Sequence, residues 1–185
     1  MQNEYDIQVE YVNFPLHPNT PPQGISLADL FGGSAALPRI RESQKQLLAL
    51  AAQEGLPMKE RTMTYNSRLA QELGCWAESK GKGPQFHDAV FKAYFAEGQA
   101  ISDPEVLAAL ARQVGLDPAE ARTVLRERRY KETVDQQWAA CENAGITGVP
   151  TFEVEGRRVV GAQPLDVLAD LLEKAGATKR AAQGN

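Results

Sequence analysis

Cysteine is scarce in this sequence and never closely paired. The chain has two cysteines, Cys75 and Cys141, and no Cys-x-x-Cys occurs anywhere in its 185 residues. A local dithiol redox motif and a disulfide framework are therefore both excluded. Histidine is equally rare, since His17 and His87 are the only two, and no Cys/His pair has the spacing of metal ligands. We expect no metal site.

Long apolar runs and an excess of basic charge are also lacking. No apolar stretch approaches the ~18 residues that span a bilayer. The polar start of the chain, residues 1–6, has neither the basic nor the apolar region of a signal peptide. The formal net charge of −4 argues against a nucleic-acid-binding face. With 43% hydrophobic residues, the composition is that of a globular protein. We expect a cytoplasmic protein without nucleic-acid or membrane partners.

Hydrophobic periodicity divides the chain into strands and helices. Residues 7–14 alternate apolar and polar side chains, which is the period of a strand. Residues 37–54 carry apolar side chains at helical spacing until Gly55 and Pro57 stop them. Further helices are expected at about 66–79, 86–94, 102–115, 117–128 and 133–144, and a last one opens at Pro164 with Leu165, Leu168, Leu171 and Leu172 facing inward. The basic run 126–129 is expected on a solvated helix face.

The segment from Gly145 to Gln163 predicts a hairpin entered by a proline. It contains a turn, the step Val149-Pro150, a short strand, a Glu155-Gly156 reversal and a second strand. A proline that enters a strand forfeits a ladder hydrogen bond and needs an edge or a special turn. Only ~5% of X-Pro bonds are cis, but this setting, with the family resemblance given below, favours cis. A cis bond would expose the backbone of Val149 to an extended peptide or a glutathione-like ligand.

Neither cysteine has the surroundings of a reactive thiol. Cys141 shares an apolar stripe with Val134 and Trp138, where a small buried residue is expected. Cys75 lies inside a predicted helix, away from a helix N-terminus that would lower the pKa of its thiol. We interpret both cysteines as structural.

A series of motifs resembles the DsbA-like thioredoxin superfamily, and within it the FrnE-type branch of cytoplasmic disulfide oxidoreductases. The motifs are Phe-Pro-Leu-His-Pro at 14–18, Tyr-Asn-Ser-Arg-Leu-Ala at 65–70, Phe-Lys-Ala-Tyr-Phe-Ala-Glu-Gly at 91–98, Gly-Leu-Asp at 115–117, Gly-Val-Pro-Thr-Phe at 148–152 and Gly-Ala-Gln at 161–163. Each motif is common by itself, but their order and spacing together are specific. The resemblance extends from about residue 7 to residue 175.

The resemblance implies an α/β fold, with a thioredoxin-like sheet and an inserted helical subdomain. The core is expected to comprise residues 1–36 and 131–185, and the insertion residues 37–130. The family's first strand and its Cys-Pro-x-Cys precede the part of the fold that is matched here, so we expect both to be missing from this chain. No catalytic residue is therefore carried over.

The family resemblance also implies a ligand-binding rim and no cofactor. The cis-proline position corresponds to Val149 and Pro150, and the neighbouring rim to Ala162 and Gln163, with Asn66 as a further candidate. Glutathione is the one small ligand that the related branches suggest.

Three functions are compatible with these features. The first is a thiol-disulfide oxidoreductase acting on a thiol- or disulfide-containing protein or on a small thiol, inactive as written because its dithiol is absent. The second is a non-catalytic thioredoxin-like domain that binds peptides. The third is a glutathione-dependent isomerase or transferase of the 2-hydroxychromene-2-carboxylate isomerase type, although Gln163-Pro164 replaces the Asp-Arg pair of that branch.

The reading frame upstream of Met1 would distinguish these functions. A Cys-Pro-x-Cys there would support the first, an in-frame stop the second, and a serine in that position the third. A sheet that lacks one strand also exposes an unpaired edge, which is a template for pairing with another chain. We therefore expect a homo-oligomer.

Overall fold

The computed structural model describes residues 1–180, and the chain forms two compact units. Unit 1 joins Met1–Leu16 to the chain from Gln136 onward, and unit 2 is His17–Asp135. Residues 17–36 lie in unit 2, whereas the boundary between a thioredoxin-like core and an insertion stays a prediction. No helix within residues 1–180 is long and apolar enough to cross a membrane.

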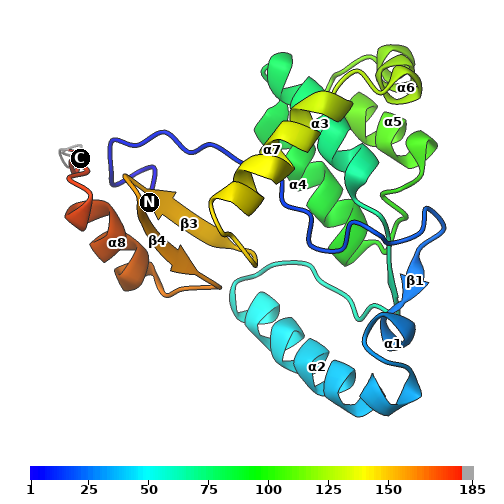
Figure 1. The fold of residues 1–185 in the computed structure, drawn as a ribbon, viewed down its shortest axis with the longest axis horizontal. Coiled ribbons are helices and arrows are strands. Elements are labelled where there is room, and N and C mark those ends of the chain that lie inside the picture. Colours follow the sequence, from blue (N-terminus) through cyan, green and yellow to red (C-terminus); the bar gives the residue numbers. More distant parts are fainter. Residues whose placement is uncertain (181–185) are drawn as a thin grey trace. The chain divides into compact units, whose positions relative to one another are not determined.

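Unit 2 is built around four helices whose apolar faces share one core (Figure 1). They are α3 (Arg68–Ser79), α4 (Gly83–Phe91), α5 (Pro104–Gln113) and α6 (Pro118–Glu127). Leu73, Trp76, Phe86 and Leu107 are the largest side chains of this core and are almost fully buried. Burial of this apolar surface is the main force that holds the unit together.

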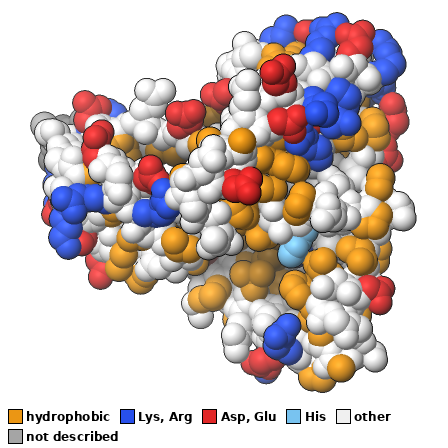
Figure 2. All heavy atoms as spheres, in the orientation of Figure 1, with side chains coloured by type: hydrophobic (Ala, Val, Ile, Leu, Met, Phe, Trp, Pro, Cys, Tyr) orange, Lys and Arg blue, Asp and Glu red, His pale blue; other side chains and the backbone are white. Residues whose placement is uncertain are grey.

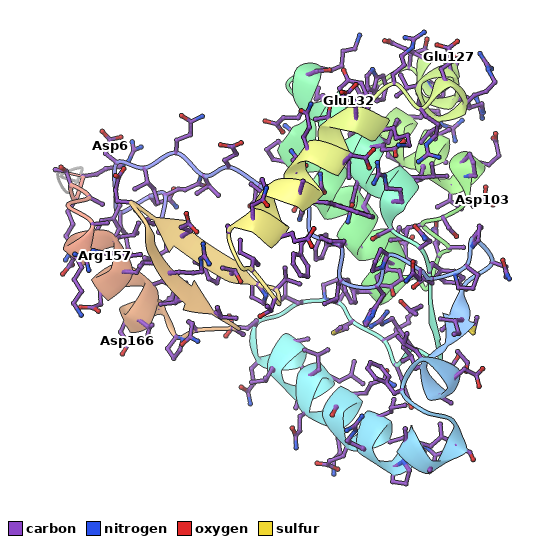
Figure 3. All side chains as sticks on the ribbon, viewed as in Figure 1. Asp6, Asp103, Glu127, Glu132, Arg157 and Asp166 are labelled. Carbon is purple, nitrogen blue, oxygen red and sulfur yellow. The ribbon has the colours of Figure 1, made fainter. Side chains whose placement is uncertain are left out.

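Helices α5 and α6 begin at the positions that the sequence predicts. The Asp103 carboxylate accepts a hydrogen bond from the amide of Glu105, and the Asp117 carboxylate accepts one from the amide of Ala119. A proline follows each cap at the first helical position, where no N–H is needed. Asp103 is seen at the start of α5 in Figure 3.

The N-terminal part of unit 2 contains elements that the sequence pattern does not indicate. Strands β1 (Ile25–Ser26) and β2 (Met63–Thr64) form a short antiparallel pair. The short helix α1 (Leu27–Leu30) and the 3₁₀ turn η1 (Ser34–Ala36) follow β1 and lead into α2 (Leu37–Gln53). Strands of two residues are too short to show a period-2 pattern, so only the long helix α2 could be predicted.

A π-helix, η2 (Lys92–Ala96), continues α4 and carries two aromatic side chains against the loop before β2. The Arg61 guanidinium lies 4.6 Å from the Tyr94 ring centroid and 4.9 Å from that of Phe95. The Gln44 side chain holds the main chain of the same arginine, accepting from its amide at 2.7 Å and donating to its carbonyl at 2.9 Å. These contacts attach α2 and its following loop to η2.

The prediction that the basic run 126–129 lies wholly on a solvated helix face is wrong. Arg128 ends α6 in the left-handed region, with φ of 52°. Its guanidinium donates to both carboxylate oxygens of Glu72, at 2.6 and 2.7 Å. Glu72 is 1% exposed and also accepts from Arg68 Nε at 2.6 Å. A buried carboxylate needs such partners, and the sequence does not show which arginine supplies them.

The Arg68 guanidinium extends this buried cluster to the start of helix α7 (Lys131–Asn143). It donates to the carbonyl of Lys131 and forms an ion pair with Asp135, both at 2.6 Å. Exposed charges of both signs lie side by side elsewhere on unit 2, over α6 in Figure 2. The Arg122–Glu105 pair, at 2.8 Å, is one of these surface pairs.

Unit 1 consists of the C-terminal part of α7, a hairpin of β3 (Thr151–Val154) and β4 (Arg157–Val160), and helix α8 (Leu165–Lys174), which packs against β4. The Tyr5 hydroxyl donates to Glu173 at 2.8 Å, and the Tyr5 backbone forms a β-bridge with Lys179. The N-terminal segment is thereby attached to the end of α8.

Two expectations for unit 1 are wrong. Residues 7–14 form no strand, although their alternation fits one. The backbone bonds described at the two ends of this segment lead from Asp6 to the Thr178 carbonyl and from Asn13 to the Gln137 side chain, and no ladder is formed. Alternation selects an extended backbone, but a strand also requires a partner. Leu165, which was expected to face inward, is 71% exposed. The buried leucines of α8 are Leu171 and Leu172, near the other end of the helix.

Candidate functional site

The β3–β4 hairpin positions the candidate rim, and its turn determines its register. Glu155 and Gly156 both have positive φ, 47° and 72°, as a two-residue type I′ turn requires. Val154 therefore pairs with Arg157, and the pairing continues to Thr151 opposite Val160. The amide of Gly161 then donates to the Pro150 carbonyl at 2.7 Å, which extends the ladder by one pair.

The Val149-Pro150 step lies at the open end of this hairpin. Its peptide bond is cis, the form favoured from the sequence. The Thr151 hydroxyl donates to the Gly148 carbonyl at 2.7 Å and closes the turn before the strand. Val149 is 49% exposed, and within residues 1–180 neither its amide nor its carbonyl makes a hydrogen bond. Two backbone groups beside Pro150 are thus available to a ligand.

Ala162 and Gln163 follow β4 directly and so lie at the same end of the hairpin. The Gly161–Pro150 hydrogen bond holds the start of one strand beside the end of the other. Gln163 Nε2 donates to the Val160 carbonyl at 2.6 Å, so this donor is used within the turn. Ala162 is exposed. Four of the five predicted rim residues are therefore brought together by one short hairpin.

Asn66, the fifth predicted rim residue, lies in unit 2 and stabilises a loop there. Its Nδ2 donates to the Thr20 carbonyl at 2.6 Å, and its Oδ1 accepts from the amide of Arg68, the first residue of α3, at 2.9 Å. These bonds use the amide to fix the loop before α3, and a role for Asn66 at a ligand rim stays a prediction.

Neither cysteine forms a disulfide, and neither lies where a thiolate would be stabilised. Cys141 is 5% exposed and its Sγ donates to the Asn13 carbonyl at 3.7 Å. Burial raises the pKa of the Cys141 thiol, and the positive charge of Arg158 only partly offsets this. Cys75 is half-buried in the middle of α3, away from the helix N-terminus. A thiol with a raised pKa is a poor nucleophile at neutral pH.

Neither histidine belongs to a metal-binding cluster in the described part of the chain. His87 stacks on Phe91 with ring centroids 4.5 Å apart. Burial lowers the pKa of His87, with a smaller opposite effect from Asp88, so the ring is neutral near pH 7. Residues 1–180 contain no group of three or more His, Cys, Asp or Glu side chains that could hold a metal ion.

Comparison with known proteins identifies the family of this fold. A family model described as a DSBA-like thioredoxin domain matches residues 1–173. The chain is 30% identical over 171 residues to the uncharacterized protein YwbO of Bacillus subtilis (strain 168), covering 88% of this chain and 79% of that one.

Two solved structures are similar to the chain. The crystal structure of a probable DsbA oxidoreductase from Streptomyces coelicolor matches with a TM-score of 0.80 and 27% identity, covering 87% of this chain and 72% of the other. A 2-hydroxychromene-2-carboxylate isomerase matches with a TM-score of 0.65 and 21% identity, covering 73% and 66%, and shows likeness of fold alone. The chain belongs to the DSBA-like thioredoxin domain family, with its Pro150 hairpin and helical insertion inside the matched region.

Proposed function

We propose that this chain is the binding scaffold of a DsbA-type thiol-disulfide oxidoreductase of the FrnE-like branch. The observation that carries the proposal is the exposed Val149, whose backbone amide and carbonyl are unbonded within residues 1–180. An extended polypeptide supplies the complementary acceptor and donor at the spacing of a β-strand. The family match supports a ligand that contains a thiol or a disulfide, either a protein segment or a small thiol.

Dithiol exchange requires a thiolate, and residues 1–185 contain no Cys-x-x-Cys. Since burial raises the pKa of Cys141 and Cys75 lies mid-helix, we expect this chain to show no activity in insulin reduction or in the reactivation of scrambled ribonuclease. The double variant Cys75→Ser/Cys141→Ser is the matched control and should give the same baseline. Turnover by the parent that is lost in the double variant would contradict this expectation.

Binding at Val149 can be tested apart from catalysis. Val149→Pro removes the backbone N–H, whereas Val149→Ala removes only side-chain atoms. We expect Val149→Pro to weaken the binding of a fluorescent cysteine-containing extended peptide by about tenfold, the cost of one or two backbone hydrogen bonds. Val149→Ala should bind within about threefold of the parent. Fluorescence anisotropy measures both affinities.

A backbone-methylated peptide series provides the same test without changing the protein. In this series each peptide carries one methylated backbone nitrogen. Methylation at one position should weaken binding sharply, and methylation at the position two residues away should also weaken it, because alternate residues of an extended peptide face the edge of the hairpin. Equal binding of all methylated peptides by the parent chain would exclude backbone recognition at Val149.

A non-catalytic peptide-binding function is the second candidate, favoured by the absence of Cys-x-x-Cys. The two candidates differ in thiol dependence. A redox scaffold should bind a cysteine-containing peptide more tightly than its serine analogue, whereas a general peptide-binding domain should bind both equally. Saturable binding of glutathione at the same site, measured by competition with the peptide, would instead support the isomerase or transferase alternative.

A cytoplasmic location is also proposed. Its support is that neither cysteine forms a disulfide, as is usual in a reducing compartment.

A further inference from the structure

Two arginines among residues 1–180, Arg61 and Arg68, are partly buried, and they differ in their partners. The Arg68 guanidinium lies 2.6 Å from the carboxylates of both Glu72 and Asp135. Arg61 forms no ion pair within the described residues, although Glu60 precedes it in the sequence. A charge that is taken out of water is costly unless ionic or hydrogen-bonding partners replace the water. The protein therefore shields the charge of Arg61 without neutralising it.

Aromatic groups, rather than carboxylates, hold the Arg61 guanidinium. It lies 4.6 Å from the ring centroid of Tyr94 and 4.9 Å from that of Phe95, and its Nη1 donates to the Tyr94 hydroxyl. The two rings meet edge to face with centroids 4.8 Å apart. Thr64 Oγ1 lies 2.9 Å from the same hydroxyl. Cation–π contacts stabilise a cation and leave its charge intact, so these groups orient the guanidinium and do not pair it.

The main chain around Arg61 is anchored as well. The Gln44 side chain accepts from the Arg61 amide at 2.7 Å and donates to the Arg61 carbonyl at 2.9 Å. Two residues earlier, the Lys59 amide donates to the Phe95 carbonyl at 2.9 Å. Both ends of this arginine are thus fixed before a ligand arrives. A group that is already ordered loses less conformational freedom on binding.

Most of the donors on the Arg61 guanidinium have no acceptor in the described chain. A guanidinium carries five N–H donors, and within residues 1–180 the Arg61 side chain uses only the Nη1 donor to Tyr94. The Nε and Nη2 N–H groups form the edge that binds two oxygens of a carboxylate or a phosphate. The adjacent rings lower the local dielectric constant, which strengthens a charge-assisted hydrogen bond.

We propose that Arg61, Tyr94 and Phe95 form a binding site for an oxyanion, which is the carboxylate or phosphate group of a small ligand. An oxyanion supplies both the counter-charge and the acceptors that Arg61 lacks. A cation would be repelled, and an apolar ligand would remove the guanidinium from water without pairing it. Two charge-assisted hydrogen bonds at a partly exposed site correspond to a Kd of about 1 mM.

This site is independent of the proposed ligand at Val149. The residues that form it lie between positions 44 and 95, entirely within unit 2, whereas Val149 lies in unit 1. Its test uses no thiol and no peptide, so either proposal can fail without the other.

Nuclear magnetic resonance of the isotope-labelled parent chain tests the site directly. The protein is titrated with succinate and, separately, with inorganic phosphate, at an ionic strength held constant with sodium chloride. The Arg61 Nε–H resonance should shift and saturate with a Kd of about 1 mM. Arg112, which is exposed on α5 and whose side chain makes no hydrogen bond or ion pair within residues 1–180, is the internal control and should show no saturation.

Substitutions separate a binding role of Arg61 from a structural one. Arg61→Gln removes the charge and should weaken anion binding by at least about tenfold. Arg61→Lys keeps the charge without the planar fork and should weaken it by about three- to tenfold. Arg112→Gln should bind within about twofold of the parent. The rise in Tm with anion concentration measures the affinities. Each variant is compared with itself without anion, so a change in its basal stability does not affect the result.

The outcomes are distinct. Saturation of the Arg61 resonance by succinate alone assigns a carboxylate ligand, saturation by phosphate alone assigns a phosphate, and saturation by both assigns a general oxyanion site. A resonance that neither anion shifts up to about 50 mM would overturn the proposal. An equal response of Arg112, or full anion-dependent stabilisation of Arg61→Gln, would overturn it as well. If Arg61→Gln does not fold, the resonance of the parent still decides.

Discussion

Replacing Glu72 with glutamine is expected to lower the free energy of unfolding of unit 2 by about 3 to 5 kcal/mol at pH 7. The substitution leaves the shape nearly unchanged but removes the charge that neutralises Arg68 and Arg128. The Arg68 side chain is 14% exposed, so its charge would remain in a largely buried setting with fewer partners. Urea unfolding followed by the helical circular dichroism signal measures the loss.

The same substitution should change the pH dependence of stability. Burial raises the pKa of Glu72, but hydrogen bonds from Arg128 and then Arg68 outweigh it and hold the pKa below its ordinary value. Because the folded pKa is depressed, the stabilisation is present above the unfolded pKa and is lost as the pH falls through the folded one. The difference between parent and Glu72→Gln should therefore be largest near pH 7 and shrink below about pH 4.

Glu105→Gln is the matched control for Glu72→Gln. It breaks the ion pair between Glu105 and Arg122, in which both side chains are exposed. Exposed pairs contribute little, so stability should hardly change. Equal effects of the two substitutions would show that the burial of Glu72 does not determine its contribution.

Leu107→Ala is expected to destabilise unit 2 by about 2 to 5 kcal/mol. Leu107 is 0% exposed and lies on α5 within the shared core. The loss combines the transfer free energy of the removed atoms with that of the cavity they leave. Leu50→Ala makes the same chemical change on helix α2 at a position that is 58% exposed, and it should alter stability by less than about 0.5 kcal/mol. A small effect of Leu107→Ala in urea unfolding would mean that the four-helix core is not cooperative.

Much of the fold follows from local signals in the sequence. Asp103-Pro104 and Asp117-Pro118 specify helix starts because a capping side chain and a missing N–H act within a few residues. Glu155-Gly156 between two short strand-like segments specifies a tight hairpin, because a two-residue turn also acts within a few residues. These predictions are confirmed by the caps of α5 and α6 and by the register of β3 with β4.

The incorrect predictions involve partners that are distant in sequence. Alternation in residues 7–14 indicates an extended segment but does not show what would pair with it. The role of Arg128 depends on Glu72, 56 residues earlier in the chain, and no periodicity links the two. The candidate rim could be predicted in part. Val149, Pro150, Ala162 and Gln163 meet because one hairpin joins them, whereas Asn66 was included only by resemblance.

Unit 1 is assembled from both ends of the sequence, which affects how the chain can fold during synthesis. The four-helix core lies wholly within residues 17–135, so unit 2 can fold while the later residues are still being translated. The N-terminal segment must wait for α7 to supply Gln137, whose Oε1 accepts a hydrogen bond from Asn13 Nδ2 at 2.6 Å, and for α8 to supply Glu173. Closing that loop costs less once the chain between its ends is already compact. The segment 1–16 is therefore synthesised well before the residues that hold it, and it is fixed only after they have emerged.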